Sequence, residues 1–169
     1  MEEQVDAGRT KYIGVSNFTS KQIAKLINNS RIQPANSQVE IHVYLQQKEH
    51  VDFCHKNGVT VVAYSPVGSR GYAQYLECEG LPAKHIPDLF DNPVVKKIAS
   101  KYNKTPAQIL LKFLVQRGIS VIPKSVTESR IIENITLFDF TIDEEDMREL
   151  YNLEIGPSAR ICNWEYATG

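Results

Sequence analysis

The chain has 169 residues, of which 42% are hydrophobic, and its 19 basic and 20 acidic side chains give a net charge of −1. This composition is typical of one globular domain, and the charge gives no electrostatic reason to bind nucleic acid or an anionic membrane. No apolar run approaches the roughly 18 residues of a membrane span, and the polar N-terminus does not resemble a signal peptide. We therefore expect a single cytoplasmic domain over residues 1–169.

Apolar residues alternate between strand-like and helix-like spacing along the chain. Residues 1–7 look like the end of a helix that stops at Gly8, which fits either a frayed terminal helix or a helix internal to a longer chain. Short apolar runs then predict buried strands at residues 12–16, 35–41, 59–64 and 119–123.

Helix-length segments with apolar residues three and four apart separate these strands. One helix should run over residues 46–57 and stop at Gly58. One further helix should begin at Pro93, and the others should follow the N-cap residues Thr19, Thr105, Thr127 and Asp143. On the helix after Thr127, the apolar face is expected to be Ile131, Ile132 and Ile135. Residues 70–92 show no regular period and are expected to form a long loop, which often marks a functional lid.

Alternating strands and helices predict an α/β fold with four parallel β/α units joined by crossover helices. A closed eight-stranded β/α barrel typically needs about 250 residues, so the sequence predicts no complete barrel. In parallel β/α folds, binding residues gather where strands end.

The predicted strand ends carry amide, hydroxyl and aromatic side chains. Ser16 and Asn17 follow the first strand, Gln38 lies in the second, and Tyr64 and Ser65 end the third. Amides and hydroxyls suit a planar amide ligand, and an exposed tyrosine suits stacking on a flat ring. Each residue alone fits a turn, a cap or core packing equally well, but their placement at successive strand ends favours a site.

The fourth strand end is followed by a cationic segment that leads into a helix. Lys124 and Arg130 flank this predicted helix start, where backbone N–H groups lack partners. Two cations beside such N–H groups indicate an anion site. Metal binding is not expected, because Glu40 and His42 form only one pair on a strand face and the three cysteines form no C-x-x-C motif.

Four stretches, at residues 13–18, 38–42, 63–69 and 122–134, together resemble the aldo-keto reductase family, which binds NADP(H) across an eight-stranded β/α barrel. The resemblance covers essentially the whole chain, in order. It implies that the chain is the C-terminal half of a (β/α)8 TIM-type barrel, with a C-terminal tail loop over residues 155–169.

The resemblance assigns roles to individual residues. Ser16, Asn17 and Gln38 match the ligands of the nicotinamide carboxamide, and Tyr64 matches the ring that stacks on nicotinamide. The loop over the pyrophosphate is matched by Ser65, Val67 and Ser69. The pocket for the adenosine 2′-phosphate, with its adjoining adenine contacts, is matched by Lys124, Ser125, Val126, Thr127, Arg130, Glu133 and Asn134.

The catalytic residues of the family have no counterpart in this sequence. The family uses an aspartate, a tyrosine, a lysine and a histidine from the first half of the barrel, and His42, His50, His55 and His85 lie in no matching motif. Trp164 fits either a wall of the substrate pocket or an aromatic that covers the surface.

The resemblance implies the NADP(H)-binding half of a reductase that converts small carbonyl compounds to alcohols, inactive alone. The alternatives are a non-catalytic module that binds NADP(H) or a partner, and a half-barrel that self-associates through its exposed edges.

Overall fold

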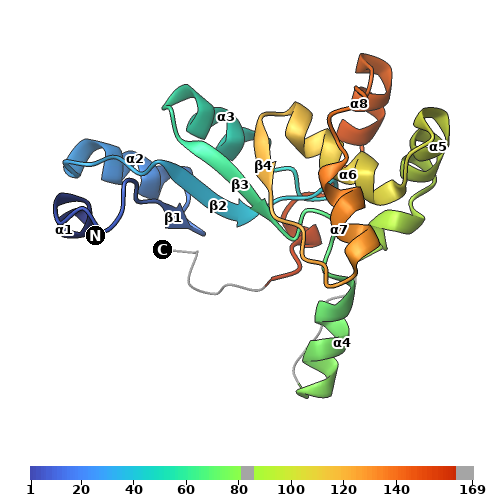
Figure 1. Cartoon of the computed structure of the whole chain (residues 1–169), viewed down its shortest axis with the longest axis horizontal. Helices are drawn as coiled ribbons and strands as arrows, with labels where there is room; N and C mark the ends of the chain where they lie inside the picture. Colours follow the sequence, from blue (N-terminus) through green and yellow to red (C-terminus); the bar gives the residue numbers. More distant parts are fainter. Residues whose placement is uncertain (81–85, 163–169) are drawn as a thin grey trace.

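We analysed a computed structural model of the chain, which describes residues 1–80 and 86–162. Parallel strands alternate with helices, as the sequence predicts (Figure 1). The strands are β1 (Val15–Ser16), β2 (Asn36–Glu40), β3 (Thr60–Tyr64) and β4 (Ile119–Val121). The helices are α1 (Glu2–Asp6), α2 (Ser20–Asn29), α3 (Lys48–Lys56), α4 (Arg70–Cys78), α5 (Pro93–Tyr102), α6 (Pro106–Gln116), α7 (Glu128–Ile135) and α8 (Glu144–Tyr151), with short 3-10 turns η1 (Leu89–Asp91) and η2 (Gly156–Ala159).

The four strands form one sheet in the order β1-β2-β3-β4, and every neighbouring pair is parallel. The predicted α/β fold with four parallel strands is therefore confirmed. The first strand is shorter than expected, because only Val15 and Ser16 pair with β2, and the Tyr12 side chain is 76% exposed.

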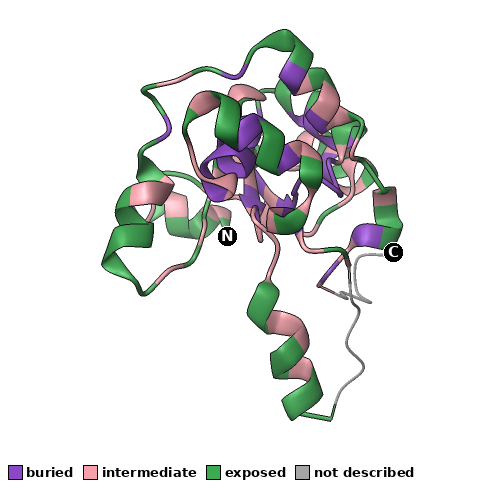
Figure 2. Ribbon diagram, turned by 90° about the vertical axis from the view of Figure 1, so that its right-hand side faces the viewer, coloured by how far each residue is buried: buried purple, intermediate pink, exposed green. Residues whose placement is uncertain are grey.

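One face of the sheet packs against helices and forms the core. Ser37 points toward α3, where its hydroxyl lies 3.1 Å from the His50 ring, and Val39, Val61 and Ala63 share its buried side. Figure 2 shows the buried residues gathered in the middle of the molecule. Since side chains alternate along a strand, residues between these positions lie on the opposite, more open face.

Several helix starts follow the predicted capping chemistry. Thr19 and Thr105 each form a reciprocal capping box with a glutamine three residues later, and Asp143 accepts a hydrogen bond from the N–H of Asp146. Thr127 does stand at the N-cap position of α7, but its side chain makes no capping hydrogen bond, so the predicted capping role is wrong.

The expected long loop over residues 70–92 is also wrong, and the apolar face expected on α7 is exposed. The segment over residues 70–92 contains the helix α4, which has no buried residue and projects from the body of the molecule (Figures 1 and 2). Tyr72, Tyr75 and Leu76 stand three and four residues apart on α4, but the helix has only 9 residues, which is a short window for a periodic signal. Ile131, Ile132 and Ile135 do lie on α7, but they are 52%, 58% and 70% exposed rather than in the core.

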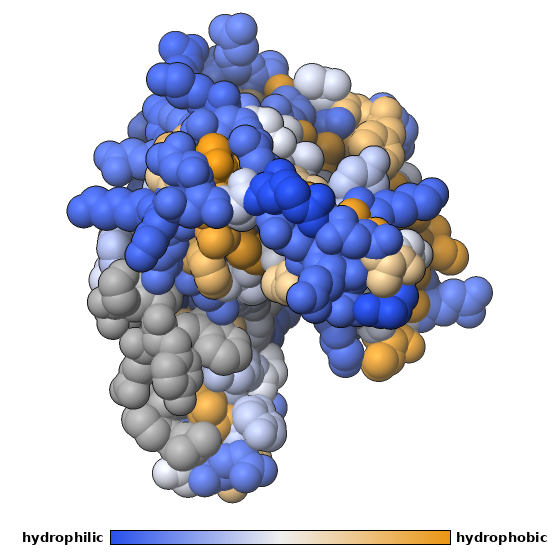
Figure 3. Space-filling model, turned by 90° about the vertical axis from the view of Figure 1, so that its left-hand side faces the viewer, coloured by the Kyte–Doolittle hydropathy of each residue, from blue (hydrophilic) through white to orange (hydrophobic). Residues whose placement is uncertain are grey.

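In the part of the chain that the structure describes, no helix is long and apolar enough to cross a membrane. Hydrophilic side chains predominate on the face of the molecule at the β1 end of the sheet (Figure 3).

Candidate functional site

The carboxyl ends of β1, β2 and β3 place three predicted site residues on the same open face of the sheet. Ser16 pairs with Gln38 across β1 and β2, and Tyr64 pairs with Glu40, two residues beyond Gln38. Because side chains two residues apart share a face, Ser16, Gln38 and Tyr64 point to the same side. Ser16 is exposed, and Gln38 and Tyr64 are half-buried, so all three can reach a ligand.

Asn17 is tied to both neighbouring strands by hydrogen bonds. Its backbone N–H donates to the carbonyl of Gln38 at 2.9 Å, and the Tyr64 hydroxyl donates to its side-chain oxygen at 3.0 Å. Asn17 adopts a left-handed conformation with φ 57°, which asparagine tolerates better than most residues. Strained positions of this kind cluster at binding sites, and this one holds the Asn17 amide and the Tyr64 ring in one arrangement.

The loop after β3 is a tight turn between Ser65 and Ser69. The N–H of Gly68 donates to the Ser65 carbonyl at 3.0 Å, and the two serine hydroxyls lie 2.8 Å apart. Ser65 has a left-handed φ of 52° and Gly68 one of 73°. A side chain on Gly68 would also lie 3.1 Å from the Leu89 side chain, so the turn depends on glycine.

The segment that leads into α7 carries the two predicted cations. Lys124 and Arg130 are both exposed, and neither forms an ion pair within residues 1–80 and 86–162. Because Thr127 does not cap α7 with its side chain, the first N–H groups of the helix remain open to a ligand. The N–H of Thr127 itself is bonded to the Ser125 hydroxyl at 3.1 Å.

The resemblance places Glu133 among the adenine contacts. Within the chain, Glu133 also forms a hydrogen bond that links two helices. Its carboxylate accepts a hydrogen bond from the hydroxyl of Thr105, the residue that caps α6. This contact joins the start of α6 to α7, so Glu133 holds the helix that carries Arg130.

A single cavity of about 580 Å³ brings the loop after β3 together with the segment around α7. Its walls include these predicted residues: Ser65, Val67, Ser69, Lys124, Ser125, Val126, Thr127, Arg130, Glu133 and Asn134. The strand-end residues Ser16, Gln38 and Tyr64 do not line this cavity. The predicted site residues therefore form two groups, one on the open sheet face and one around the cavity.

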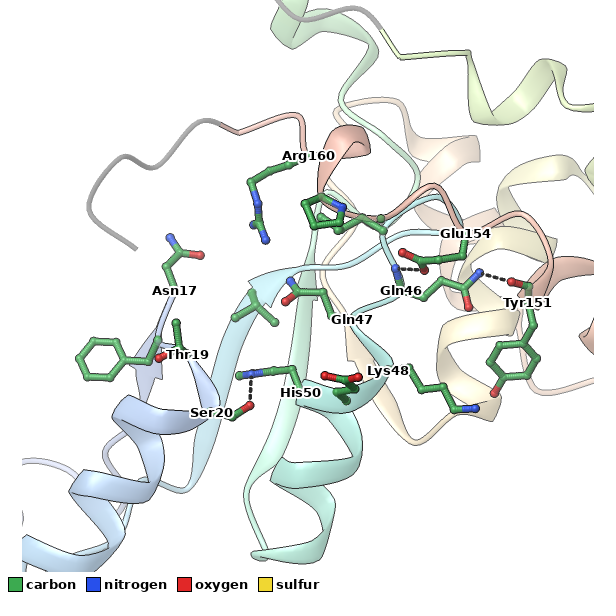
Figure 4. A pocket seen from close by; sticks show the side chains of 16 residues that line it. Asn17, Thr19, Ser20, Gln46, Gln47, Lys48, His50, Tyr151, Glu154 and Arg160 are labelled. Carbon is green, nitrogen blue, oxygen red and sulfur yellow. Dashed lines mark hydrogen bonds between the residues drawn. The ribbon is translucent and has the colours of Figure 1, made fainter. Parts of the chain in front are cut away.

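A second cavity, of about 740 Å³, lies between the starts of α2 and α3 and the turn η2. Asn17 lines it at one side, and Arg160 points into it from the η2 side (Figure 4). His50 also lines it and is held between the hydroxyls of Ser20 and Ser37, at 3.2 and 3.1 Å, and burial lowers its pKa. No local pattern in the sequence indicates this cavity, because its walls come from segments far apart in the chain.

The chemistry of the 580 Å³ cavity fits a phosphorylated ligand. Lys124 and Arg130 supply positive charge, and Ser65, Ser69 and the open start of α7 supply hydrogen-bond donors. No cluster of three or more potential metal ligands occurs among the described residues. His42 and His50 are buried and His55 is exposed on α3, whereas His85 and Trp164 lie outside the described residues.

Comparisons with known proteins agree with this geometry. The sequence model of the aldo/keto reductase family matches residues 1–155. The chain is 42% identical over 156 residues to an NAD(P)H-dependent D-xylose reductase of Candida tenuis, an alignment that covers 92% of this chain and 48% of that protein. It is also 42% identical over 166 residues to aldo-keto reductase family 1 member A1 of Gallus gallus, covering 98% of this chain and 46% of that protein.

A crystal structure of an aldo-keto reductase complexed with NADPH shares the fold, with a TM-score of 0.79 and 41% identity. The match covers 94% of this chain and 47% of that structure. The chain thus spans about half the length of the relatives that it matches. The chain belongs to the aldo/keto reductase family.

Proposed function

We propose that residues 1–169 form one domain that is the NADP(H)-binding, C-terminal half of an aldo-keto reductase barrel. The sequential order of four parallel strands supports this proposal, because consecutive neighbouring strands are the arrangement of a β/α barrel. The matched share of the NADPH-complexed relative, close to half, agrees with it.

The observation that carries the proposal is the 580 Å³ cavity with Lys124 and Arg130 on its wall. A bare ribose hydroxyl does not need two cations, whereas a 2′-phosphate does. We therefore assign Lys124, Ser125, Val126, Thr127 and Arg130 to the 2′-phosphate, which selects NADP(H) over NAD(H). Glu133 and Asn134 would contact the adenine at the same wall.

On the open sheet face, Ser16, Asn17 and Gln38 would bind the carboxamide of the nicotinamide, and the Tyr64 ring would stack on it. The loop with Ser65, Val67 and Ser69 would cover the pyrophosphate. A bound nicotinamide cofactor supplies a hydride to a small-molecule carbonyl compound. The residues of this chain orient the ring that donates it, while the proton donor lies outside residues 1–169.

This division of roles predicts that residues 1–169 alone do not reduce carbonyl compounds. General acid catalysis contributes about 10²–10⁴-fold to such reactions, and the open sheet face admits water, which weakens stabilisation of the developing alkoxide. The test is NADPH oxidation at 340 nm over a panel of aldehydes. Turnover should appear only when the N-terminal half of a close relative is refolded with the chain.

The proposal would be contradicted if residues 1–169 alone reduced an aldehyde and if a substitution within these residues abolished that activity. The reductases among its relatives favour an enzyme over a non-catalytic binding module.

The two edges of the sheet favour self-association of the isolated chain. β1 and β4 each lack a second neighbour among the described strands. Beside β4, the exposed Ile131, Ile135 and Phe138 line an apolar cavity. A second copy would supply parallel strands to both edges. Native mass spectrometry should then detect a dimer that Phe138→Asp weakens, and a monomer at all concentrations would contradict this expectation.

A further inference from the structure

The end of β2 carries a carboxylate that is fully buried and that holds a distant part of the chain. The two carboxylate oxygens of Glu40 accept hydrogen bonds from the backbone N–H groups of Ile161 and Cys162, at 2.7 and 2.9 Å. These donors lie about 120 residues further along the chain. A single side chain of the sheet thus fixes the backbone of residues 161 and 162.

His42 completes this anchor as a third donor. Its Nδ1 accepts a hydrogen bond from the N–H of Tyr44 at 3.3 Å, so the ring proton lies on Nε2, which is 3.2 Å from the carboxylate of Glu40. The His42 ring therefore donates to Glu40 through Nε2. Burial raises the pKa of the Glu40 carboxyl, but the hydrogen bonds from His42 and the two backbone N–H groups outweigh it and hold the pKa below its ordinary value.

A separate set of contacts holds the chain just before this segment. The carbonyl of Tyr44 accepts from the N–H groups of Ile155 and Gly156, at 2.9 and 3.1 Å, and the carboxylate of Glu154 accepts from the N–H of Gln46 at 2.6 Å. These bonds do not involve residues 161 and 162. Glu154 is consequently a matched control, because it is another carboxylate that bonds one backbone N–H in the same region.

The position of Glu40 connects the anchor to the candidate site. Glu40 pairs with Tyr64 in the sheet and follows Gln38 by two residues on the same face. Ile161 lines a small cavity together with Val67, Gly68 and Ser69. The anchored backbone therefore lies beside the loop that follows β3.

We propose that Glu40 is a positioning residue, which holds Ile161 and Cys162 beside the loop of residues 65–69 and so orders residues 161 and 162 next to the cofactor site. The assignment of that loop to the cofactor rests on the proposed function, but the anchor itself does not. The three donors satisfy a charge that would otherwise be costly to bury, which makes the ordered arrangement the stable one.

The Cys162 thiol responds to the loss of Glu40 in two ways, through its exposure and through its acidity. Burial and the nearby charge of Glu40 raise its pKa to about 11, so alkylation by iodoacetamide should be slow in the folded protein. Glu40→Gln removes the charge, and its amide NH2 group faces a backbone N–H that it cannot accept from. Both proteins carry Cys78→Ser, which removes the exposed thiol. In this background, we expect iodoacetamide to alkylate Cys162 at least tenfold faster in Glu40→Gln than in the protein that keeps Glu40.

Two controls separate release of the segment from unfolding. Cys54 is fully buried in the core and should remain protected in Glu40→Gln. Glu154→Gln should leave the alkylation rate of Cys162 unchanged. Parallel acceleration at Cys54 and Cys162 would mean general unfolding and would overturn the proposal, as would an unchanged rate at Cys162.

Hydrogen exchange of the Ile161 and Cys162 amides, followed by NMR, tests the anchor without depending on thiol acidity. Both amides should exchange at least tenfold faster in Glu40→Gln, and unchanged exchange would overturn the proposal. If Glu40→Gln does not fold, His42→Leu removes only one of the three donors and should still raise exchange severalfold. Neither readout involves NADPH, so a chain that fails to bind NADPH would contradict the proposed function and leave the anchor standing.

Discussion

The side chain of Tyr64 offers a graded test of the strand-end site, because its ring and its hydroxyl have separate roles. The ring is half-buried on the open face, and the hydroxyl donates to Asn17 at 3.0 Å. Tyr64→Phe removes only the hydroxyl, whereas Tyr64→Ala removes both. The two substitutions should therefore change stability and NADPH affinity in different proportions.

The structure sets the expected magnitudes. Losing the hydroxyl bond in Tyr64→Phe should cost about 0.5–1.5 kcal/mol of unfolding free energy, with a small effect on affinity. Removing the ring should weaken NADPH binding by about 1–3 kcal/mol, the range for a base stacked on an aromatic side chain. Because the ring is not in the core, Tyr64→Ala should destabilise the fold by less than the roughly 3–5 kcal/mol of a buried aromatic.

Fluorescence titration with NADPH and urea unfolding of the same three proteins measure both quantities. We expect the NADPH affinity to fall slightly from wild type to Tyr64→Phe and to fall much more from Tyr64→Phe to Tyr64→Ala. If Tyr64→Ala loses several kcal/mol of stability and no affinity, the ring is a packing residue and the stacking role is wrong. If Tyr64→Phe loses as much affinity as Tyr64→Ala, the hydroxyl rather than the ring is responsible.

Two further predictions concern the scaffold. Gly14→Ala should lower the free energy of unfolding by about 1–3 kcal/mol, because the new methyl group would lie 2.9 Å from the Asn36 backbone carbonyl oxygen. Gly71→Ala is the control, because its methyl group would meet nothing within 4 Å. Equal melting temperatures for the two variants would contradict this prediction. The hydrogen bond from the Asp146 N–H, the ion pair with Lys101 and the nearby Tyr102 hydroxyl hold the pKa of the Asp143 carboxyl below its ordinary value of 3.8. Wild type should therefore be more stable than Asp143→Asn at pH 7, and this difference should shrink as the pH falls below 3.8. A difference in urea unfolding free energy that stays constant from pH 7 to pH 2 would refute the prediction.

Residues that bury an apolar surface or cap a helix were predictable from the sequence. The strand at 60–64 is a short, largely apolar run, and the capping boxes at Thr19 and Thr105 have a local spacing. The strand at 36–40 has only one apolar residue, Val39, and its signal comes from the apolar residues that flank it. These signals depend only on neighbouring residues. The grouping of site residues at strand ends was also predictable, because parallel strands bring their carboxyl ends to one edge of the sheet.

Features that depend on distant segments were not predictable. The exposure of Ile131 and Ile135 is decided by what packs on α7, and their helical spacing is the same in either case. The anchor at Glu40 joins residues more than 100 positions apart. Its one local signal is a carboxylate inside an apolar run, which indicates that a buried charge needs donors but not where they come from.

We propose that Lys124 and Arg130 bind the 2′-phosphate of NADP(H). NADPH and NADH are titrated against wild type, Lys124→Ala and Arg130→Ala, with Arg148→Ala, which removes an exposed cation on α8, as the control. Each site variant should lose about 1.5–3 kcal/mol of NADPH binding, the scale of a charged hydrogen bond, and little NADH binding. Equal losses for the two cofactors, or an equal loss in Arg148→Ala, would contradict the assignment.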